Sequence, residues 1–163
     1  MIDDFSGQPE TRWRFFTDGV MGGVSIGGVS FGRDAQGAFA HMTGRVSTRN
    51  NGGFIQIQTA ISQQPPARAQ GLRLVVRGDG QRYFVHLKTS ATAMPWDHYR
   101  AGFDTGPDCS PDWTEVRLPF AAFVRSRRGP QLDPRAERLL TLGLVAYGRD
   151  HDADIALRSV GYF

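Results

Sequence analysis

The sequence predicts an all-β fold, either a sandwich or a barrel of antiparallel strands. Apolar and polar residues alternate along much of the chain, whereas helical periodicity is scarce. The 20 glycines and 9 prolines are spread throughout, so turn-forming residues repeatedly interrupt short apolar segments. Strict alternation indicates sheets with one buried and one more exposed face, and many short strands joined by frequent turns are typical of all-β domains.

The clearest strand lies in the segment GFIQIQTAI. There, Ile55, Ile57 and Ile61 fall on one face of an extended chain, and Gln56 and Gln58 fall on the other. The same alternation predicts strands in LRLVVR (72–77) and YFVHLKTS (83–90). Further strands are predicted at 38–44, 99–104, 113–118, 141–147 and 154–162.

Two short helical turns are expected between these strands. In LDPRAERLLT, Asp133 can cap a helix and Pro134 suits the first helical position, which predicts a helix of about two turns. A second short turn is expected in PFAAF, residues 119–123.

Length and composition indicate one domain, residues 1–163, that lies in the cytoplasm. Domains commonly contain ~100–200 residues. Cys109 is the only cysteine, which excludes an internal disulfide and favours a reducing compartment. The first residues, MIDDFSGQPE, are acidic where a secretory signal is basic, and no apolar run of ~18 residues is present.

The charge of the chain gives little support for nucleic-acid binding. The formal net charge is +3, and Lys88 is the only lysine. The arginines are scattered, whereas a nucleic-acid footprint is a denser basic stripe with aromatic residues between the cations. One basic patch, Arg125, Arg127 and Arg128 in VRSRRG, could support a weak contact with an acidic partner or an anionic membrane surface.

The segment DGVMGGVSIGG contains a literal G-x-S-x-G pattern around Ser25. A hydrolase needs a strand before that serine and a helix after it, and the following IGGVSFGRD has no helical periodicity. A phosphate-binding loop needs Lys and Ser or Thr after its last glycine, and these are missing. We therefore expect a glycine-rich structural loop with no catalytic residue, and we treat an esterase centred on Ser25 as the weakest alternative.

Metal and cofactor sites are not expected either. Asp150, Asp152 and Asp154 have D-x-D-x-D spacing, but Ile155 and Gly161 stand where a calcium loop needs glycine and glutamate. A polar hairpin turn is the favoured interpretation, with a weak cation site as the alternative. No complete catalytic constellation emerges, so the residues alone favour a binding protein without a cofactor.

Three segments together resemble the complex I intermediate-associated protein 30 family. They are DGVMGGVS (18–25), GRVSTRNNGGFIQIQ (44–58) and DWTEVRLPFAAF (112–123), in this order. The resemblance covers nearly the whole chain. It implies a jelly-roll β-sandwich of the galactose-binding-domain-like class.

The resemblance also implies a role in the assembly of respiratory complex I through protein contacts and without catalysis. The expected partners are complex I subunits or assembly factors, which could bring the protein to the inner membrane. The alternative is a carbohydrate-binding module, for which Trp96 and Trp113 would be stacking platforms.

The family motif supplies the candidate binding residues at one end of the sandwich. We expect Asp18 and Asn51 to hydrogen-bond loop backbone, and the motif residues either to hold two loops together or to line a ligand site. Met21 would then be an adaptable contact for a partner. The full candidate set is Asp18, Met21, Gly22, Gly23, Ser25, Asn50, Asn51, Gly53, Trp96 and His98.

Overall fold

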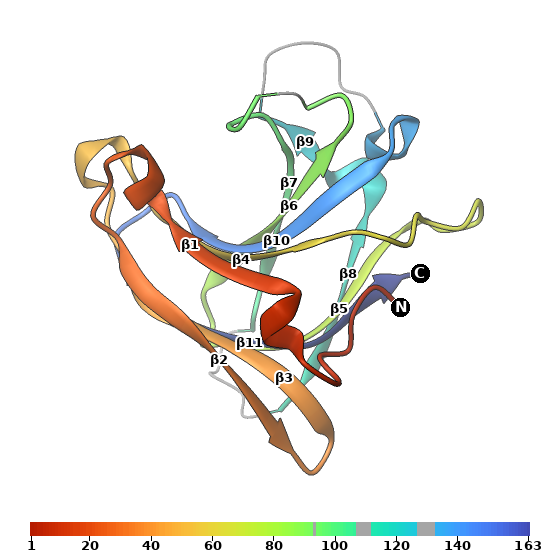
Figure 1. Cartoon of the computed structure of the whole chain (residues 1–163), viewed down its shortest axis with the longest axis horizontal. Helices are drawn as coiled ribbons and strands as arrows, with labels where there is room; N and C mark the ends of the chain where they lie inside the picture. The colour runs from red at the N-terminus through yellow and green to blue at the C-terminus, as the bar shows by residue number, and fades with distance from the viewer. Residues whose placement is uncertain (93, 107–111, 127–132) are drawn as a thin grey trace.

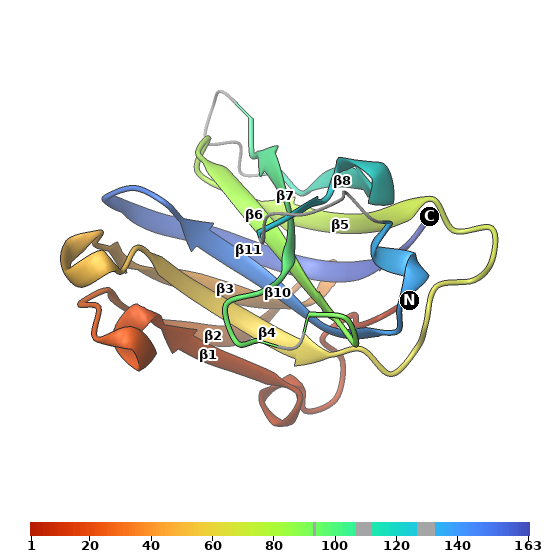
Figure 2. The same ribbon diagram turned by 90° about the horizontal axis from the view of Figure 1, so that it is seen from above.

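A computed structural model describes residues 1–92, 94–106, 112–126 and 133–163, and these residues form two stacked antiparallel sheets (Figure 1). The six-stranded sheet has the order β1 (Trp13–Thr17), β4 (Phe54–Ala60), β10 (Leu139–Tyr147), β6 (Arg82–Thr89), β7 (Tyr99–Asp104), β9 (Val124–Arg125). The five-stranded sheet has the order β2 (Ile26–Asp34), β3 (Gly37–Val46), β11 (His151–Tyr162), β5 (Gly71–Arg77), β8 (Thr114–Pro119). Figure 2 shows the two layers from above.

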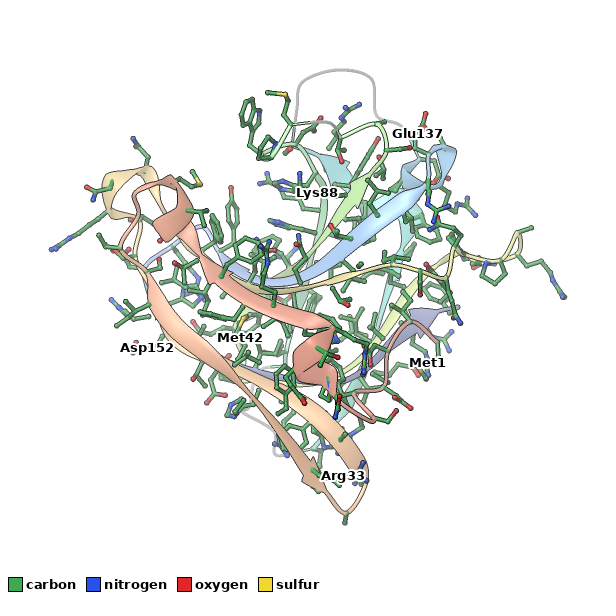
Figure 3. The ribbon with its side chains drawn as sticks, viewed as in Figure 1. Met1, Arg33, Met42, Lys88, Glu137 and Asp152 are labelled. Atoms are coloured by element: carbon green, nitrogen blue, oxygen red, sulfur yellow. The ribbon has the colours of Figure 1, made fainter. Side chains whose placement is uncertain are left out.

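The core lies between the two sheets and is built from the alternation seen in the sequence. Ile55 and Ile57 of β4 are fully buried, as are Leu142 and Leu144 of the neighbouring β10. From the other sheet, β3 contributes Met42, which Figure 3 places between the layers. Because alternate residues point to opposite faces of a strand, the polar partners of these residues must lie on the outer face of each sheet.

Every helical segment of the described residues is a single 3-10 turn. These turns are η1 (Pro9–Thr11), η2 (Asp18–Met21), η3 (Arg49–Asn51), η4 (Phe120–Ala122) and η5 (Pro134–Ala136). The turn expected at 119–123 is present as η4. No helix in this part of the chain is long and apolar enough to cross a membrane.

The helix expected after Asp133 is wrong in length. The Asp133 side chain does accept a hydrogen bond from the Arg135 backbone N–H, as a cap should. However, the turn ends at Ala136 and β10 begins at Leu139, whose side chain is fully buried. Strand pairing and burial of this segment in the sheet therefore outweigh its local helical preference.

The sequence did not predict β1, β2 or the two-residue β9. The segment that becomes β2 is rich in glycine, and its sequence predicts a loop. In the structure, Gly27 and Gly44 face each other across β2 and β3, and a Cβ on Gly27 would lie 2.4 Å from the carbonyl oxygen of Thr43. Here glycine permits close backbone approach within a strand pair and does not mark a loop.

The six-stranded sheet is bent into a trough on the side that faces away from the core. Figure 1 shows β1, β4 and β10 as the floor, with η2 and η3 at one rim and β6 and β7 rising at the other. This bend, together with the right-handed twist common to sheets, turns an outer sheet face into a concave surface.

Candidate functional site

The loop after β1 is organised around the buried carboxylate of Asp18, which has no exposed surface. Its Oδ2 accepts hydrogen bonds from Ser25 Oγ at 2.5 Å, Gly53 N at 2.6 Å and Phe54 N at 3.3 Å, and its Oδ1 accepts one from Ser25 N at 3.0 Å. Burial alone raises the pKa of Asp18, but these donors outweigh it and hold the pKa below its ordinary value. The carboxylate thus joins the η2 loop to the turn before β4.

The glycines of the two family motifs make room for this carboxylate. A Cβ on Gly23 would lie 2.3 Å from Asp18 Cγ, and a Cβ on Gly52 would lie 2.4 Å from Asp18 Oδ2. Gly22 and Gly53 have φ angles of +85° and +131°, which side chains disfavour. The prediction that Asp18 hydrogen-bonds loop backbone is confirmed.

The corresponding prediction for Asn51 is wrong, because the neighbouring Asn50 makes the bond. The Asn50 side chain donates from Nδ2 to the Gly22 carbonyl oxygen at 3.2 Å. Both asparagines have positive φ angles, 57° and 59°, so the two residues shape the turn in the left-handed region. Asn51 is instead one of the residues that line the trough.

Ser25 is placed as a structural residue. Its hydroxyl donates to Asp18 Oδ2 and accepts the Ser47 N–H at 2.9 Å, and the residue is 5% exposed. A nucleophilic serine instead needs a base that takes its proton and an open approach for the substrate. Among its described hydrogen-bond partners there is no histidine, so this geometry does not support an esterase centred on Ser25.

A groove of about 850 Å³ occupies the trough of the six-stranded sheet. Its floor comes from the outer face of β1, β4, β10, β6 and β7, and its rims come from the η2 loop and the segment before β7. The residues that line the groove include Arg14, Phe16, Val20, Met21, Phe54, Gln56, Gln58, His86, Lys88, Trp96, His98, Arg100 and Tyr147. The groove therefore brings together residues from the whole length of the chain.

Strand register sets five of the floor positions in one row across the sheet. Arg14 is opposite Gln58, which is opposite Gly143; Gly143 is opposite His86, and His86 is opposite Arg100. Gly143 lowers the middle of the row, because a Cβ there would lie 2.6 Å from Gln56 Oε1. The row thus has a low centre without a side chain, polar residues on either side of it, and a cation at each end.

The two guanidinium groups of this row rest on aromatic rings. The Arg14 guanidinium carbon lies 4.7 Å from the centroid of Phe16, and that of Arg100 lies 5.5 Å from the centroid of Tyr147. Arg100 also donates to the Tyr147 hydroxyl at 3.2 Å. Stacking of this kind orients a guanidinium while leaving N–H groups at its edge free for a ligand.

The rim that carries Trp96 is held by two cations. Lys88 Nζ donates to the carbonyl oxygens of Met94 and Asp97 at 2.9 and 3.0 Å. Arg125 pairs with the Asp97 carboxylate at 2.9 Å, where the Asp97 side chain is only 1% exposed. The Trp96 side chain itself is left 66% exposed beside the groove, where an aromatic contact for a ligand would be expected.

A stacked pair of histidines, His86 and His98, lies in the groove floor. Their ring centroids are 4.0 Å apart and their planes differ by 16°. Burial is the largest cause that lowers the pKa of His86 to about 2, and the nearby charges of His98, Arg100 and Lys88 lower it further. Burial also lowers the pKa of His98. Both rings are therefore neutral at physiological pH.

This histidine pair does not suit a metal ion. The ligand lone pairs lie in the planes of the two nearly parallel rings and do not converge on one point at the ~2.1 Å that a bound ion requires. Within the described part of the chain, no group of three or more His, Cys, Asp or Glu residues has metal-binding geometry.

The three aspartates of the D-x-D-x-D segment have separate partners. Asp150 accepts hydrogen bonds from the backbone and hydroxyl of Thr48, Asp152 lies 3.6 Å from Arg45, and Asp154 contacts His41 at 2.6 Å. Their carboxylates are thus directed to three different neighbours.

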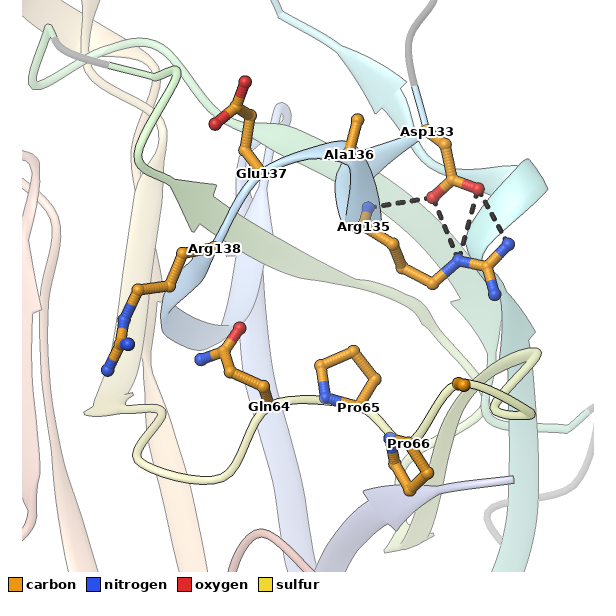
Figure 4. Close-up of a pocket in the computed structure, with 9 residues that line it drawn as sticks. Gln64, Pro65, Pro66, Asp133, Arg135, Ala136, Glu137 and Arg138 are labelled. Carbon is orange, nitrogen blue, oxygen red and sulfur yellow. Dashed lines mark hydrogen bonds and ion pairs between the residues drawn. The ribbon is translucent and has the colours of Figure 1, made fainter.

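A second hollow, of about 700 Å³, lies between the loop before β5 and the turn before β10 (Figure 4). Several of its polar side chains already have partners: Gln64 exchanges two hydrogen bonds with the Leu139 backbone, and Arg135 binds the Asp133 carboxylate and the Ala69 carbonyl oxygen. This hollow is open and offers few free polar groups, so the trough groove is the stronger candidate site.

The match to known proteins follows the sequence motifs around Asp18. Residues 4–158 match the family model described as complex I intermediate-associated protein 30. The chain belongs to the complex I intermediate-associated protein 30 family. The resemblance inferred from the sequence is confirmed, and the family motif proves to be the Asp18 cluster at one rim of the groove.

Solved structures share the fold of this family member at low sequence identity. A family 11 carbohydrate-binding module from Clostridium thermocellum, in complex with a β-1,3-1,4-mixed-linked tetrasaccharide, has a TM-score of 0.72 at 15% identity, over 100% of this chain and 94% of that chain. The family 11 module of the cellulase Lic26A-Cel5E from the same organism has a TM-score of 0.73 at 14% identity, over 100% and 92%. No match was found among the curated proteins. The predicted jelly-roll β-sandwich is confirmed.

Arg125 and Trp113, two further candidates from the sequence, lie in surroundings that differ from those expected. Arg125 of the basic patch is not a free surface cation, because it is committed to Asp97; Arg127 and Arg128 lie outside the described residues. Trp113 directly precedes β8 and packs beside the five-stranded sheet, away from the groove, with the guanidinium carbons of Arg77 and Arg158 at 4.7 and 4.2 Å from its ring centroid. Neither residue is available for the role suggested by the sequence.

No sequence pattern singles out Arg14, Arg100, Gln56 or Tyr147 as site residues. The alternation in β4 had placed Gln56 and Gln58 on the face away from the core, which was the available signal. Strand order and the bending of the sheet decide which outer face becomes a groove. The local alternation of apolar and polar residues carries no information about either.

Proposed function

We propose that this family member is a non-catalytic binding domain that acts in the assembly of respiratory complex I, and that the trough groove is its binding surface. Membership of the complex I intermediate-associated protein 30 family is the observation that carries the assembly role. The proposed partners are complex I subunits or other assembly factors.

The composition of the groove supports a protein partner. At one rim Val20 and Met21 are 75% and 59% exposed, and at the other Trp96 is 66% exposed. Exposed apolar residues around a polar floor are typical of interaction sites, and tryptophan is frequent among residues that dominate binding energy. Met21 adds an adaptable side chain at the same rim.

The test is affinity purification of the tagged protein from native membranes, followed by mass spectrometry. Wild type should enrich complex I subunits or assembly factors, and the double variant Trp96→Ala/Met21→Ser should lose that enrichment. Ile26→Ser is the matched control, because Ile26 is 69% exposed but does not line the groove. Absence of enrichment with wild type would refute the assembly role.

Carbohydrate binding in the same groove is the second candidate. It is favoured by Trp96 and Tyr147 beside the amides of Gln56 and Gln58, since sugars bind by stacking on aromatic rings and by hydrogen bonding to planar polar groups. The structural neighbour with a bound tetrasaccharide adds support through the fold. Thermal-shift and calorimetric titration with neutral glucan oligosaccharides test it, and a flat response to the whole panel would remove it.

A further inference from the structure

The charges of the groove are all of one sign. Arg14, Lys88 and Arg100 line it, and none of the described residues that line it is an aspartate or a glutamate. Within the described part of the chain, none of these three cations has a carboxylate partner within ion-pair distance. Several arginines outside the groove do have one, namely Arg12, Arg73, Arg82, Arg117, Arg135 and Arg158.

The acidic residues nearest to the groove do not reach it. Asp97 lies below the Trp96 rim, almost fully buried against Arg125. Asp18 lies below the other rim, fully buried among backbone N–H and hydroxyl donors. A ligand in the groove therefore meets the cations directly, while both carboxylates are turned toward the protein.

The two arginines are held at a defined separation. They stand at opposite ends of the row that runs from Arg14 through Gly143 to Arg100. Four strand-to-strand steps of ~4.8 Å span at most about 19 Å, and the bend of the sheet shortens the distance. An extended peptide rises ~3.3 Å per residue, so its carboxylates would match both arginines when they are about four to six residues apart.

We propose that the groove binds an extended acidic segment of a partner protein, with carboxylates about four to six residues apart at Arg14 and Arg100 and apolar side chains against Met21 and Trp96. This inference rests on the proposed function, in which the groove binds a protein. Charge complementarity selects the acidic residues, and the exposed aliphatic and sulfur-containing side chains at the rim favour a peptide over a glycan.

The direct test is fluorescence anisotropy with labelled synthetic peptides of equal length, built on one set of residues that contains leucine, tryptophan, serine and two glutamates. In one peptide the glutamates are about five positions apart, in a second they are adjacent, and in a third both are replaced by glutamine. Wild type should bind the first peptide at least about tenfold more tightly than the third, with affinity that falls as salt rises. The second peptide should bind more weakly than the first.

The protein variants are Arg14→Gln/Arg100→Gln and a charge-matched control, Arg33→Gln/Arg68→Gln. Arg33 and Arg68 are exposed and do not line the groove, and Figure 3 places Arg33 at the far end of the β2–β3 hairpin. The groove variant should lose about tenfold in affinity for the first peptide, and the control should stay within about twofold of wild type. Circular dichroism checks that both variants are folded.

Three results would overturn the inference. They are equal losses in the groove and control variants, equal affinity for the charged and uncharged peptides, and binding of polygalacturonate without binding of the acidic peptides. The membrane purification separates this inference from the proposed function. Enrichment of complex I proteins without peptide binding rejects only the acidic-segment inference, and peptide binding without such enrichment rejects only the assembly role.

Discussion

Replacement of Asp18 by asparagine tests whether the buried carboxylate holds the groove rim together. Asparagine keeps the shape of the side chain but replaces one acceptor oxygen with an N–H₂ donor. In the less costly orientation the amide nitrogen takes the place of Oδ1, so that the N–H of Ser25 loses its acceptor. The three bonds to Oδ2, from Ser25 Oγ, Gly53 N and Phe54 N, then have a neutral acceptor.

The expected loss follows from these four bonds. A buried donor without an acceptor costs ~1–3 kcal/mol, and each bond to a charged group exceeds a neutral one by ~1 kcal/mol. Relief from burying a charge offsets part of this sum. We therefore expect Asp18→Asn to lower the free energy of unfolding by about 3 kcal/mol, which is a fall in Tm of about 6–12 °C for a chain of this size.

The assay is urea unfolding followed by tryptophan fluorescence, at pH 7 and at lower pH. Because the folded-state pKa of Asp18 is lowered, its contribution is fully present above its ordinary pKa of 3.8 and is lost as the pH falls through the folded-state value. The difference between wild type and variant should therefore shrink below pH ~4. Asp152→Asn is the control, because that side chain is 86% exposed, and its stability should be unchanged.

A loss below about 1 kcal/mol at pH 7 would refute this reasoning, because a carboxylate with four donors would then contribute no more than a single neutral hydrogen bond. A difference that stays constant down to pH 3 would contradict the assigned role of the Asp18 charge in the folded state.

The remaining predictions concern the same rim and the groove floor. Gly23→Ala should lower the unfolding free energy by about 3 kcal/mol or prevent folding, since its Cβ would lie 2.3 Å from Asp18 Cγ. The control Gly28→Ala places its Cβ in open space and should fold normally in the same urea assay. Equal stability of the two variants would contradict the steric argument. His86 should remain neutral down to pH ~4 in NMR titration of its ring, and a midpoint near 6.5 would be incompatible with its burial. Since unfolded histidine takes up a proton below pH ~6.5, this burial should make wild type lose stability as the pH falls from about 6.5, and His86→Gln should lose less. Arg125→Leu should lower the unfolding free energy by about 3 kcal/mol, because it removes the ion-pair partner of a buried carboxylate, and calorimetry showing no change would refute that role for the pair.

The sequence by itself determined the fold class, most of the strands and the family. Alternation in β4, β5 and β6 is a local property that requires one face to be buried, so it predicts a strand before any tertiary structure is known. The family motif likewise includes Asp18 together with Gly23 and Gly52, where a Cβ would collide with the carboxylate.

Only the tertiary structure decided where those residues lie and which of them can meet a ligand. Arg14 and Arg100 are separated by about half of the chain, and four strand pairings in a non-sequential order place them at the two ends of one row. Arg125 has the same charge, yet its contact with Asp97 removes it from the surface. Strand pairing and ion pairing between distant segments are properties of the folded chain, so the local pattern around an arginine cannot distinguish a ligand contact from a structural cation.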